Sequence, residues 1–563
     1  MSDIQVSDII SEQVFYPNCD GKKIVAYVDS RTGDEDAPFV VVMPKYGETK
    51  KNNLSLAYYL VSNGFRVIRF DFTSHFGESD GAMLDFTLSE AVGNVTATLD
   101  FLERTYGCEQ VTLLANSLSS LVAVRAASLE RRVIHLVSVV GVVNLTHTLV
   151  KVYQDDLVGG FIQGRRYGVL DILGHEVHMD RFFEATVRDE FHRLEDMARD
   201  ISRIDAPISW FPASNDAWVR MEDVQYVARG NEQMSIHPIE GAMHEVRESQ
   251  DTAERSLRMI VKVCRARHFE EPISIEEVKV PDRRTLFGQN RIERERLRRI
   301  KVFEGSETDF WGQYLDKYRV MEKIDDFQGY LDLVGDLMGA LEQDDILLDA
   351  GCGNGLFGVW VLRDLVQKKA FQDGRRPVYM GIELTASGLG EAIEKHKTAR
   401  DILAETHERH NPAVDLVYAR ADLEEFGDRR KTWGKILQFS DNCFDKIVCS
   451  LLLSYLDKPE RLLKQLHRVL QPGGRIVVSS MKPFCDLSAI YRDFIEQKAT
   501  KSEVESAREL LRAAGAIKVK EEQGYYNFFS AEQLTEMVEG AGFRRVQCFA
   551  SLGNQANVVA AIK

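Results

Sequence analysis

The sequence contains no long apolar run. No stretch approaches the roughly 18 uninterrupted apolar residues that a membrane-spanning helix requires. Its first residues, MSDIQVSDIISEQ, lack the basic start and apolar block of a secretory signal peptide. Its eight cysteines are scattered without a C-x-x-C pair, which argues against a zinc site and a disulfide scaffold. We therefore expect no membrane span, no metal site and a reducing, cytoplasmic location.

Basic residues are fewer than acidic residues. Lysine and arginine number 71 against 87 aspartates and glutamates, so the formal net charge at pH 7 is −16. This excess of acid argues against a nucleic-acid partner, because such binders depend on cationic contacts with phosphates. Hydrophobic residues make up 44% and charged residues 28%, as is ordinary for a soluble globular protein. A chain of 563 residues is too long for one core, so we expect two or more domains.

The order of the expected elements divides the chain into three parts. Residues 1–268 and residues 304–563 each alternate short apolar strands with amphipathic helices, which predicts an α/β fold for both. Between them, residues 269–303 are rich in arginine and poor in apolar anchors, which is typical of a linker or a solvated helix. A docking surface for an acidic carrier protein is the second interpretation of these arginines.

The first part has strands that are apolar throughout. Residues 39–44, 66–72, 110–116 and 133–141 are predicted to be buried parallel strands. Residues 146–204 break this rhythm with charged helices. We expect this segment to be an insertion that lies over the sheet.

A serine lies where a predicted strand meets a predicted helix, in the quintet Ala115-Asn116-Ser117-Leu118-Ser119. In α/β hydrolases the nucleophile occupies such a sharp turn, and small residues two positions before and after it avoid a clash. Alanine and serine stand here in place of the usual glycines. A helix-capping serine is the alternative interpretation.

Two further residues follow in the chain order Ser, Asp, His that this fold requires. Asp216 ends a predicted strand, and His244 lies in a loop after the next strand. His244 would take the proton of Ser117, and Asp216 would hold the tautomer of the imidazole. His237 lies within the expected strand and Asp205 before one, so both are weaker candidates.

An oxyanion hole needs two backbone N–H groups. The first would come from Leu118, directly after the nucleophile, and the second from the loop MPKYGETKK, at Lys45 or Tyr46. Lys45, Lys50 and Lys51 are expected near the mouth of the pocket. They are interpreted either as solubilising charges or as contacts for an acidic acyl carrier protein.

Four segments together resemble the acyl-transferase (myristoyl-ACP thioesterase) of the bacterial bioluminescence operon: NGFRVIRFDFTSHFGESDG, LLANSLSS, ILGHEVHMDRFFEATVRDEF and SNDAWVRMEDV. The similarity spans roughly residues 10–265 and includes the insertion. It implies an α/β-hydrolase fold, a Ser117–Asp216–His244 triad and a carrier-bound acyl thioester as substrate. His75, in TSHFG, also matches a family histidine, and we expect it to be structural.

The last part opens its strand and helix pattern with the glycine turn LLDAGCGNG, which holds Asp349, Gly351, Gly353 and Gly355. Glycines at this position let the backbone approach a nucleoside-bearing ligand and begin a helix. Such a turn also occurs in dinucleotide-binding domains and as a simple tight turn. We expect Asp349 and the glycines to lie against one end of such a nucleoside-bearing ligand.

The residues after the turn favour this ligand. Glu383 ends a second strand, where it could accept hydrogen bonds from a ribose diol, and Asp422 with Leu423 follows a third strand, near an adenine. With FDKIV and LQPGG, the series resembles class I S-adenosylmethionine-dependent methyltransferases over roughly residues 305–563. An NAD-binding domain would leave FDKIV and LQPGG unexplained.

Tyr314 and Tyr318 are predicted to share one face of the helix before the turn. They could close over the sulfonium ligand by cation–π attraction, and ordinary aromatic packing is the equal alternative. We expect the small-molecule methyl acceptor to bind under an insertion at residues 484–527, which holds Tyr491 and Tyr525. No N-P-P-Y follows the fourth strand, which argues against methylation of DNA bases or glutamine.

The leading hypothesis is a bifunctional enzyme. Its first domain would hydrolyse or transfer an acyl group from a carrier thioester, and its second would methylate an intermediate of fatty-acid, polyketide or nonribosomal-peptide type. No histidine falls at a predicted acceptor position, so a carboxylate acceptor, which needs no base, is favoured over a hydroxyl. Two alternatives remain: a carrier-independent esterase or amidase, and a hydrolase fold that only binds.

Overall fold

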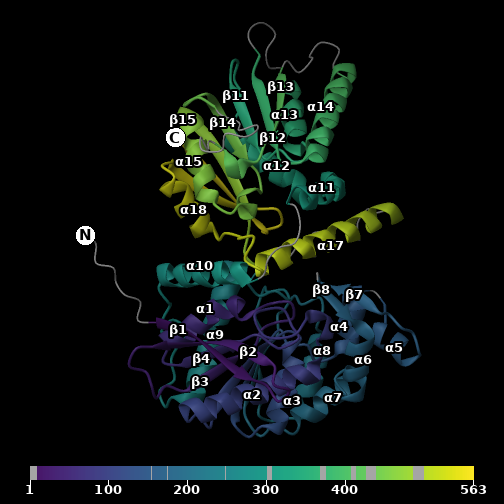
Figure 1. The fold of residues 1–563 in the computed structure, drawn as a ribbon, viewed down its shortest axis with the longest axis vertical. Helices are drawn as coiled ribbons and strands as arrows, with labels where there is room; N and C mark the ends of the chain where they lie inside the picture. The colour runs from purple at the N-terminus through teal and green to yellow at the C-terminus, as the bar shows by residue number, and fades with distance from the viewer. Residues whose placement is uncertain are drawn as a thin grey trace. The chain divides into compact units, whose positions relative to one another are not determined.

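The computed structural model describes residues 9–153, 155–173, 175–247, 249–300, 307–367, 376–406, 414–426, 439–485 and 500–563. The chain forms two compact units, and each is described by itself. The first comprises Met1–Val302 with Glu522–Gly524, and the second comprises Phe303–Glu521 with Tyr525–Lys563. Both have the α/β architecture that the sequence predicts (Figure 1).

The first unit is built on an eight-stranded sheet with the order β1-β2-β4-β3-β5-β6-β9-β10. β2 pairs antiparallel with β1 and β4, and the strands from β4 to β10 are parallel. The strands are β1 (Ile9–Pro17), β2 (Lys23–Arg31), β3 (Phe39–Val42), β4 (Arg66–Phe70), β5 (Val111–Asn116), β6 (Val133–Val139), β9 (Ile208–Phe211) and β10 (Met234–Ile236). The four expected parallel strands are all present.

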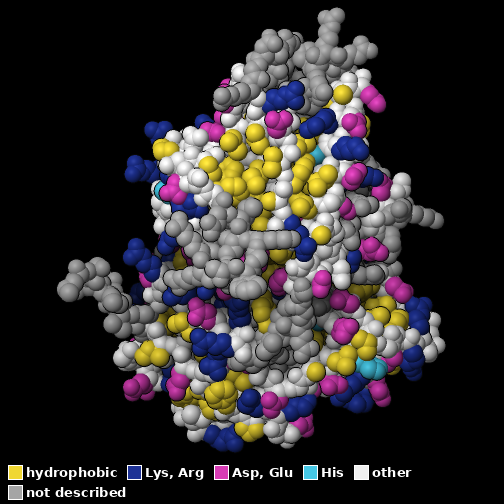
Figure 2. All heavy atoms as spheres, turned by 45° about the horizontal axis from the view of Figure 1, so that its top comes forward, with side chains coloured by type: hydrophobic (Ala, Val, Ile, Leu, Met, Phe, Trp, Pro, Cys, Tyr) yellow, Lys and Arg dark blue, Asp and Glu magenta, His cyan; other side chains and the backbone are white. Residues whose placement is uncertain are grey.

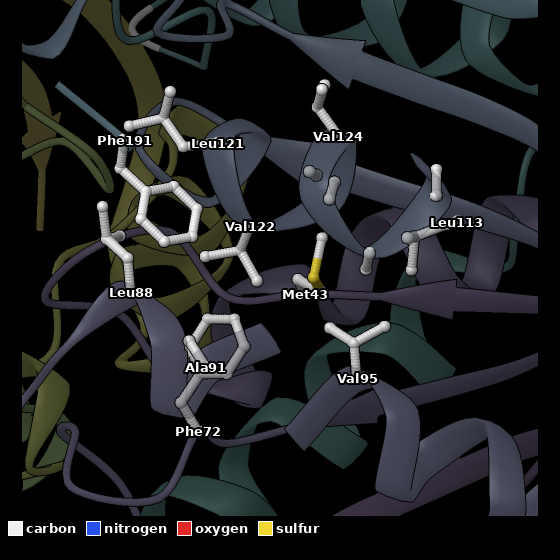
Figure 3. Close-up of a cluster of buried hydrophobic side chains, with 14 of the residues drawn as sticks. Met43, Phe72, Leu88, Ala91, Val95, Leu113, Leu121, Val122, Val124 and Phe191 are labelled. Atoms are coloured by element: carbon white, nitrogen blue, oxygen red, sulfur yellow. The ribbon is translucent and has the colours of Figure 1, made fainter. Parts of the chain in front are cut away.

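Helices cover both faces of this sheet. Alternate residues of one strand enter opposite cores: Val41 packs with α2 and α3, whereas Val40 and Val42 pack with α1 and α9. Burial on both faces explains why these strands are apolar throughout. Figure 3 shows the first core, where Met43 and Leu113 meet side chains of the helices. The helices and short 3-10 turns are η1 (Lys50–Asn53), α1 (Leu54–Ser62), η2 (Met83–Asp85), α2 (Leu88–Tyr106), α3 (Ser119–Leu129), α8 (Met221–Ala228) and α9 (Gln250–His268).

The expected insertion is present between β6 and β9. It contains the predicted charged helices and also a two-stranded antiparallel hairpin that the sequence did not reveal. Its helix α6 is amphipathic and buries Phe182 and Phe183 in the first core. The elements are α4 (Leu145–Tyr153), α5 (Leu157–Ile162), β7 (Val169–Ile172), β8 (His175–His178), α6 (Met179–Arg188) and α7 (Leu194–Ile201).

The segment expected to be a linker or a solvated helix contains helix α10 (Arg283–Ile300), which belongs to the first unit. Glu293 of α10 is 2% exposed and binds the fully buried Arg69 through two hydrogen bonds of 2.6 and 2.8 Å. Leu297 is buried as well. The helix is therefore solvated on one face only, and its other face is packed.

The second unit is a seven-stranded sheet with the order β13-β12-β11-β14-β15-β17-β16. β17 pairs antiparallel with both β15 and β16, and the other neighbours are parallel. The strand order reverses between β11 and β14, which makes their carboxyl ends the expected ligand site. The strands are β11 (Ile346–Ala350), β12 (Val378–Glu383), β13 (Asp415–Arg420), β14 (Phe444–Cys449), β15 (Leu470–Met481), β16 (Arg544–Ser551) and β17 (Ala556–Ile562).

Helices also cover both faces of the second sheet, with α12 and α13 on one core and α15 and α18 on the other. The segment LQPGG begins β15, with an irregularity in its pairing with β14. The helices are α11 (Glu307–Lys317), η3 (Tyr318–Lys323), α12 (Asp325–Met338), α13 (Leu356–Gln367), α14 (Ala386–Thr406), η4 (Leu423–Glu425), η5 (Leu453–Tyr455), α15 (Pro459–Val469), α17 (Lys501–Glu522) and α18 (Ala531–Gly540).

In the described ranges, none of the helices combines the length and the apolarity that a bilayer crossing needs. Figure 2 shows basic and acidic side chains interspersed over the face in view, without a broad area of either sign. A mixed surface of this kind agrees with the acidic balance of the sequence.

Candidate active sites

The turn between β5 and α3 holds Ser117 in the left-handed region, with φ at 53°. Its N–H donates to the carbonyl of Val139 at 3.0 Å, and its carbonyl accepts from the N–H of Val142 at 3.1 Å. A non-glycine residue in this region stores strain, so the surrounding bonds must over-determine it. The hydroxyl of Ser119 adds two hydrogen bonds, because it accepts from the Asn116 N–H and donates to the Asn116 carbonyl. The serine that replaces the usual glycine at position 119 therefore helps to hold the turn.

The structure brings the three predicted relay residues together. Ser117 Oγ lies 2.7 Å from His244 Nε2, and His244 Nδ1 lies 2.8 Å from Asp216 Oδ2. The other oxygen of Asp216 accepts from the N–H groups of Trp218 and Val219 at 2.8 and 3.1 Å. Ser117 and His244 are 5% exposed. The carboxylate therefore aligns the imidazole so that its Nε2 faces the hydroxyl.

Trp218 is a site residue that the sequence reasoning missed. Its ring lies over His244 with 4.4 Å between the ring centroids. Its carbonyl accepts from the hydroxyl of Thr148 in α4, so the insertion contacts the loop that holds Asp216. The two rival residues do not take part in this relay. His237 follows β10 directly and stacks on Phe211 of β9, and Asp205 is exposed. The letters DAW beside the aspartate were the available signal.

The loop after β3 carries Tyr46, one of the two residues expected to provide the second oxyanion donor. Within the described residues, the backbone N–H groups of Leu118 and Tyr46 have no hydrogen-bond partner. The neighbouring N–H of Gly47 donates to His75 Nε2 at 3.2 Å. Burial lowers the pKa of His75 to about 3, so its imidazole is neutral and can accept this bond. The structural role expected for His75 is to hold this loop.

The lysines expected at the pocket mouth are placed differently. Lys50 and Lys51 are buried, and Lys50 forms ion pairs of 2.6 Å with Asp71 and 2.5 Å with Glu78. Lys45 is ion-paired as well. The expectation of a lysine surface for a carrier protein is therefore wrong. Buried acidic partners, distant in the sequence, neutralise Lys45 and Lys50.

The glycine turn of the second unit connects β11 to α13. Gly351, Gly353 and Gly355 all have positive φ, at 84°, 53° and 87°. A Cβ on Gly355 would lie 2.7 Å from the Cα of Ala392, so only glycine fits there. A Cβ on Gly353 would meet only Leu315, at 3.5 Å. The turn is closely packed at one end and has space beside Gly353.

His396 supports this turn and was not predicted. Its Nε2 donates to the carbonyl of Gly355 at 2.7 Å, and its Nδ1 lies 2.7 Å from the hydroxyl of Tyr418. Burial lowers the pKa of His396 to about 4, so the ring is neutral. Gly358 makes room for it, because a Cβ there would lie 2.2 Å from the ring. The sequence signal was the glycine inside the following helix.

Glu383 and Asp349 lie at the carboxyl ends of neighbouring strands. Glu383 accepts from the N–H of Gly353 at 3.1 Å and from Thr385 at 2.9 Å, so it also holds the turn. Asp349 is 1% exposed and accepts from the hydroxyl of Tyr379 at 2.6 Å. Its Oδ1 is buried without a partner in the described chain. Burial raises the pKa of Asp349 to about 7.

The residues assigned to the adenine follow β13. Asp422 is exposed and caps η4 by accepting from the N–H of Glu424 at 2.9 Å. Leu423 is buried in the same hydrophobic core as Ile382 of β12, which is the core that α15 and α18 cover. Both residues follow β13, which pairs with β12, the strand that ends at Glu383.

The two tyrosines expected on one helix are in different elements. Tyr314 lies in α11, whereas Tyr318 begins the 3-10 segment η3. Their rings are nevertheless 5.7 Å apart, within a cluster that includes Trp311 and Tyr455. The cluster packs as a core, which is the alternative stated for these tyrosines.

Part of the expected acceptor insertion lies outside the described residues, including Tyr491. At its end, Tyr526 donates to Glu307 of α11 at 2.7 Å, and Lys520 of α17 pairs with the same carboxylate at 2.8 Å. The ring of Tyr526 also lies 5.1 Å from that of Tyr455. The insertion thus contacts the helix that precedes the glycine turn.

Comparison with known proteins separates the two units. A family model described as acyl transferase matches residues 37–258, and one described as methyltransferase domain matches residues 322–548. The acyl transferase of Photobacterium leiognathi is 28% identical over 226 residues, covering 37% of this chain and 70% of the relative. That of Photorhabdus luminescens is 32% identical over 196 residues, covering 34% and 63%.

Two solved esterase structures are similar to slightly less than half of this chain. An esterase of Pyrococcus furiosus is 16% identical with a TM-score of 0.35, covering 46% of this chain and 94% of that chain. The ferulic-acid-bound esterase Est1E of Butyrivibrio proteoclasticus is 18% identical with a TM-score of 0.38, covering 45% and 97%.

The resemblances drawn from the sequence are therefore confirmed for both halves. The N-terminal half is similar to acyl transferases of the bioluminescence-operon type, and the C-terminal half matches the model described as methyltransferase domain. The chain joins two α/β units, each of which is similar to a family of enzymes.

Proposed function

We propose that the first unit is a serine thioesterase or acyltransferase. The observation that supports this most strongly is the continuous relay from Ser117 Oγ through His244 to Asp216, at 2.7 and 2.8 Å. The strained φ of Ser117 is that of a nucleophile in a sharp strand-to-helix turn, and its hydroxyl meets His244. A purely binding platform has no need of this alignment.

The relay sets out the steps. Ser117 Oγ attacks the acyl carbonyl carbon while His244 Nε2 takes its proton, and Asp216 stabilises the resulting imidazolium. The N–H groups of Leu118 and Tyr46 hold the oxyanion. As the tetrahedral intermediate collapses, the carbon–sulfur bond breaks and His244 returns the proton to the leaving thiol. Water or another acceptor then attacks the acyl-enzyme by the same route.

The acyl donor we propose is a thioester on a carrier protein. The named acyl transferases that resemble this unit, and the shared insertion over the sheet, support an acyl substrate. A carrier-independent esterase is the rival. Acyl-carrier thioesters and p-nitrophenyl esters, assayed side by side, separate the two by their ratio of kcat/KM.

The second unit is proposed to bind S-adenosylmethionine, and its residues fit that group. Space beside Gly353 and the unpartnered buried Oδ1 of Asp349 suit the methionine end, and Glu383 suits the ribose. Asp422 with Leu423 suits the adenine. When bound, the cofactor supplies a methyl group on a cationic sulfur.

Catalysis in the second unit then rests on positioning. We propose a small-molecule acceptor bound beside the aromatic cluster, with a carboxylate favoured over a hydroxyl because no free base faces the turn among the described histidines. His396 is buried and hydrogen-bonded on both nitrogens, and His467 packs on Phe543.

One experiment tests both activities. Acyl groups loaded on a carrier protein are incubated with the enzyme, with and without S-adenosylmethionine, and followed by intact mass. We expect acyl loss from the carrier and a methyl addition only when the cofactor is present. Ser117→Ala should stop acyl loss and fluorophosphonate labelling while S-adenosylmethionine binding persists. Acyl release at the wild-type rate by that variant would overturn the triad.

A further inference from the structure

Four charged side chains link the base of the proposed triad to the loop of its oxyanion hole. Glu245, directly after His244, accepts from Lys45 Nζ at 2.6 Å through one oxygen and from Arg247 Nε at 2.6 Å through the other. Arg247 Nη2 then donates to Glu48 at 2.6 Å. The path from Lys45 to Glu48 thus passes entirely through residues that follow the histidine.

These contacts hold the loop at both ends. Tyr46, whose N–H is the proposed second oxyanion donor, lies between Lys45 and Glu48 in the sequence. Arg247 also donates to the carbonyl of Asn52 at 3.3 Å, just beyond the loop. The loop is therefore fastened on either side of Tyr46 to the segment that carries His244.

The network is too buried to be incidental. The side chains of Glu48 and Glu245 are 2% and 8% exposed, and those of Lys45 and Arg247 are 14% and 23% exposed. Desolvating such charges consumes most of what their attraction gains, so they are weak evidence for stability alone. What a planar guanidinium with two carboxylates supplies is a fixed geometry.

We propose that Glu245 and Arg247 are positioning residues for acyl transfer, because they fix the distance between the oxyanion loop and the catalytic histidine. The inference rests on the proposed serine chemistry of this unit. Its consequence is specific: loosening the network displaces a donor that acts in the transition state, while the ground-state acyl site is untouched. Such a change lowers kcat and leaves KM.

The test compares Glu245→Gln and Arg247→Lys in the full chain, with p-nitrophenyl butyrate as substrate and a fluorophosphonate probe. Arg247→Lys keeps the charge but replaces the planar guanidinium, which donates to Glu245 and Glu48 through two different nitrogens, by a single flexible ammonium. We expect both variants to lose about tenfold to a hundredfold in kcat and in the labelling rate, since small misplacements are that costly. KM should stay within about threefold.

A matched control is available in the same unit. Asp200→Asn breaks another largely buried ion pair, with Arg125 at 2.6 Å, which contacts neither loop. This variant should lose thermal stability yet label at the wild-type rate below its melting temperature. The proposal is overturned if Glu245→Gln or Arg247→Lys labels at the wild-type rate, or loses no more than Asp200→Asn. Failure of the wild type to label would instead refute the serine chemistry.

Discussion

The two units place their sites at the same position of an α/β sheet by opposite means. In the first, a non-glycine residue, Ser117, is forced to φ 53° so that a side chain projects from the turn. In the second, Gly351, Gly353 and Gly355 adopt positive φ so that no side chain is there at all. One turn presents a reactive group, and the other makes space for a ligand.

The supporting contacts differ accordingly. Around Ser117, hydrogen bonds run from side chain to side chain, through His244 to Asp216. Around the glycine turn they run to the backbone, from His396 to the Gly355 carbonyl and from the Gly353 N–H to Glu383. We infer that the first site is sensitive to changes in its functional groups and the second to changes in volume.

The largest expected effect tests the first half of that comparison. Asp216→Asn keeps the volume but removes the charge that aligns His244, so acyl transfer should fall by about a thousandfold or more. Fluorophosphonate labelling and ester hydrolysis measure it. S-adenosylmethionine binding, measured by calorimetry, should not change. A loss of less than tenfold would mean that the relay is not used.

The second prediction changes volume alone. Gly355→Ala would place a Cβ 2.7 Å from Ala392 and 2.8 Å from His396, at a φ of 87°. We expect S-adenosylmethionine affinity to fall at least about a hundredfold, because the turn must move. Calorimetry measures it, with labelling of Ser117 as the control. Affinity close to that of the wild type would contradict the importance of volume.

The third prediction concerns helix α10, which the sequence suggested was a linker. Glu293→Ala leaves the buried guanidinium of Arg69 with Asp29 as its remaining carboxylate partner, at a cost of about 3 kcal/mol. The loss of stability is measured by urea unfolding of the full chain, followed by hydrogen exchange of peptides from β3 to β5. Glu295→Ala, at an exposed position on the same helix, is the control and should change little. Equal losses of stability in the two variants would show that the ion pair of Glu293 with Arg69 does not stabilise the first unit.

The smallest expected effect is a pH dependence in the second unit. Burial raises the pKa of Asp349 from 3.8 to about 7, so the native state holds this proton more tightly than the unfolded chain. Raising the pH from about 4 through 7 therefore removes stability. Asp349→Asn does not titrate, so its stability relative to the wild type should increase from pH 5 to pH 8. Urea unfolding with hydrogen exchange of β11 and β14 peptides measures it, and a constant difference would contradict the burial effect.

The elements that the sequence predicted well are those with a local signature. The buried strands around Val41 and Leu113 are apolar throughout, and the turns at Ser117 and Gly353 carry their residue types in consecutive positions. The chain order of Ser117, Asp216 and His244 was enough to anticipate which side chains meet. The contacts at 2.7 and 2.8 Å join residues that such a fold brings to one edge of its sheet.

The misassigned residues have long-range partners. Lys50 and the arginine-rich helix α10 were interpreted as solvated because charged residues usually are. The structure buries Lys50 against Asp71 and Glu78, and Glu293 against Arg69. The residues next to each of these charges in the sequence do not indicate that it pairs with a residue far along the chain.

The sequence by itself therefore determined that this chain joins two α/β units, and which residues stand at the turns after β5 and β11. The reason is that strand burial, turn conformation and chain order leave local traces in residue type. Only the tertiary structure decided that Glu245 and Arg247 fasten the loop after β3 and that His396 supports the glycine turn. Such contacts depend on distance in space, because charges and buried rings are stabilised by whichever partner the fold delivers.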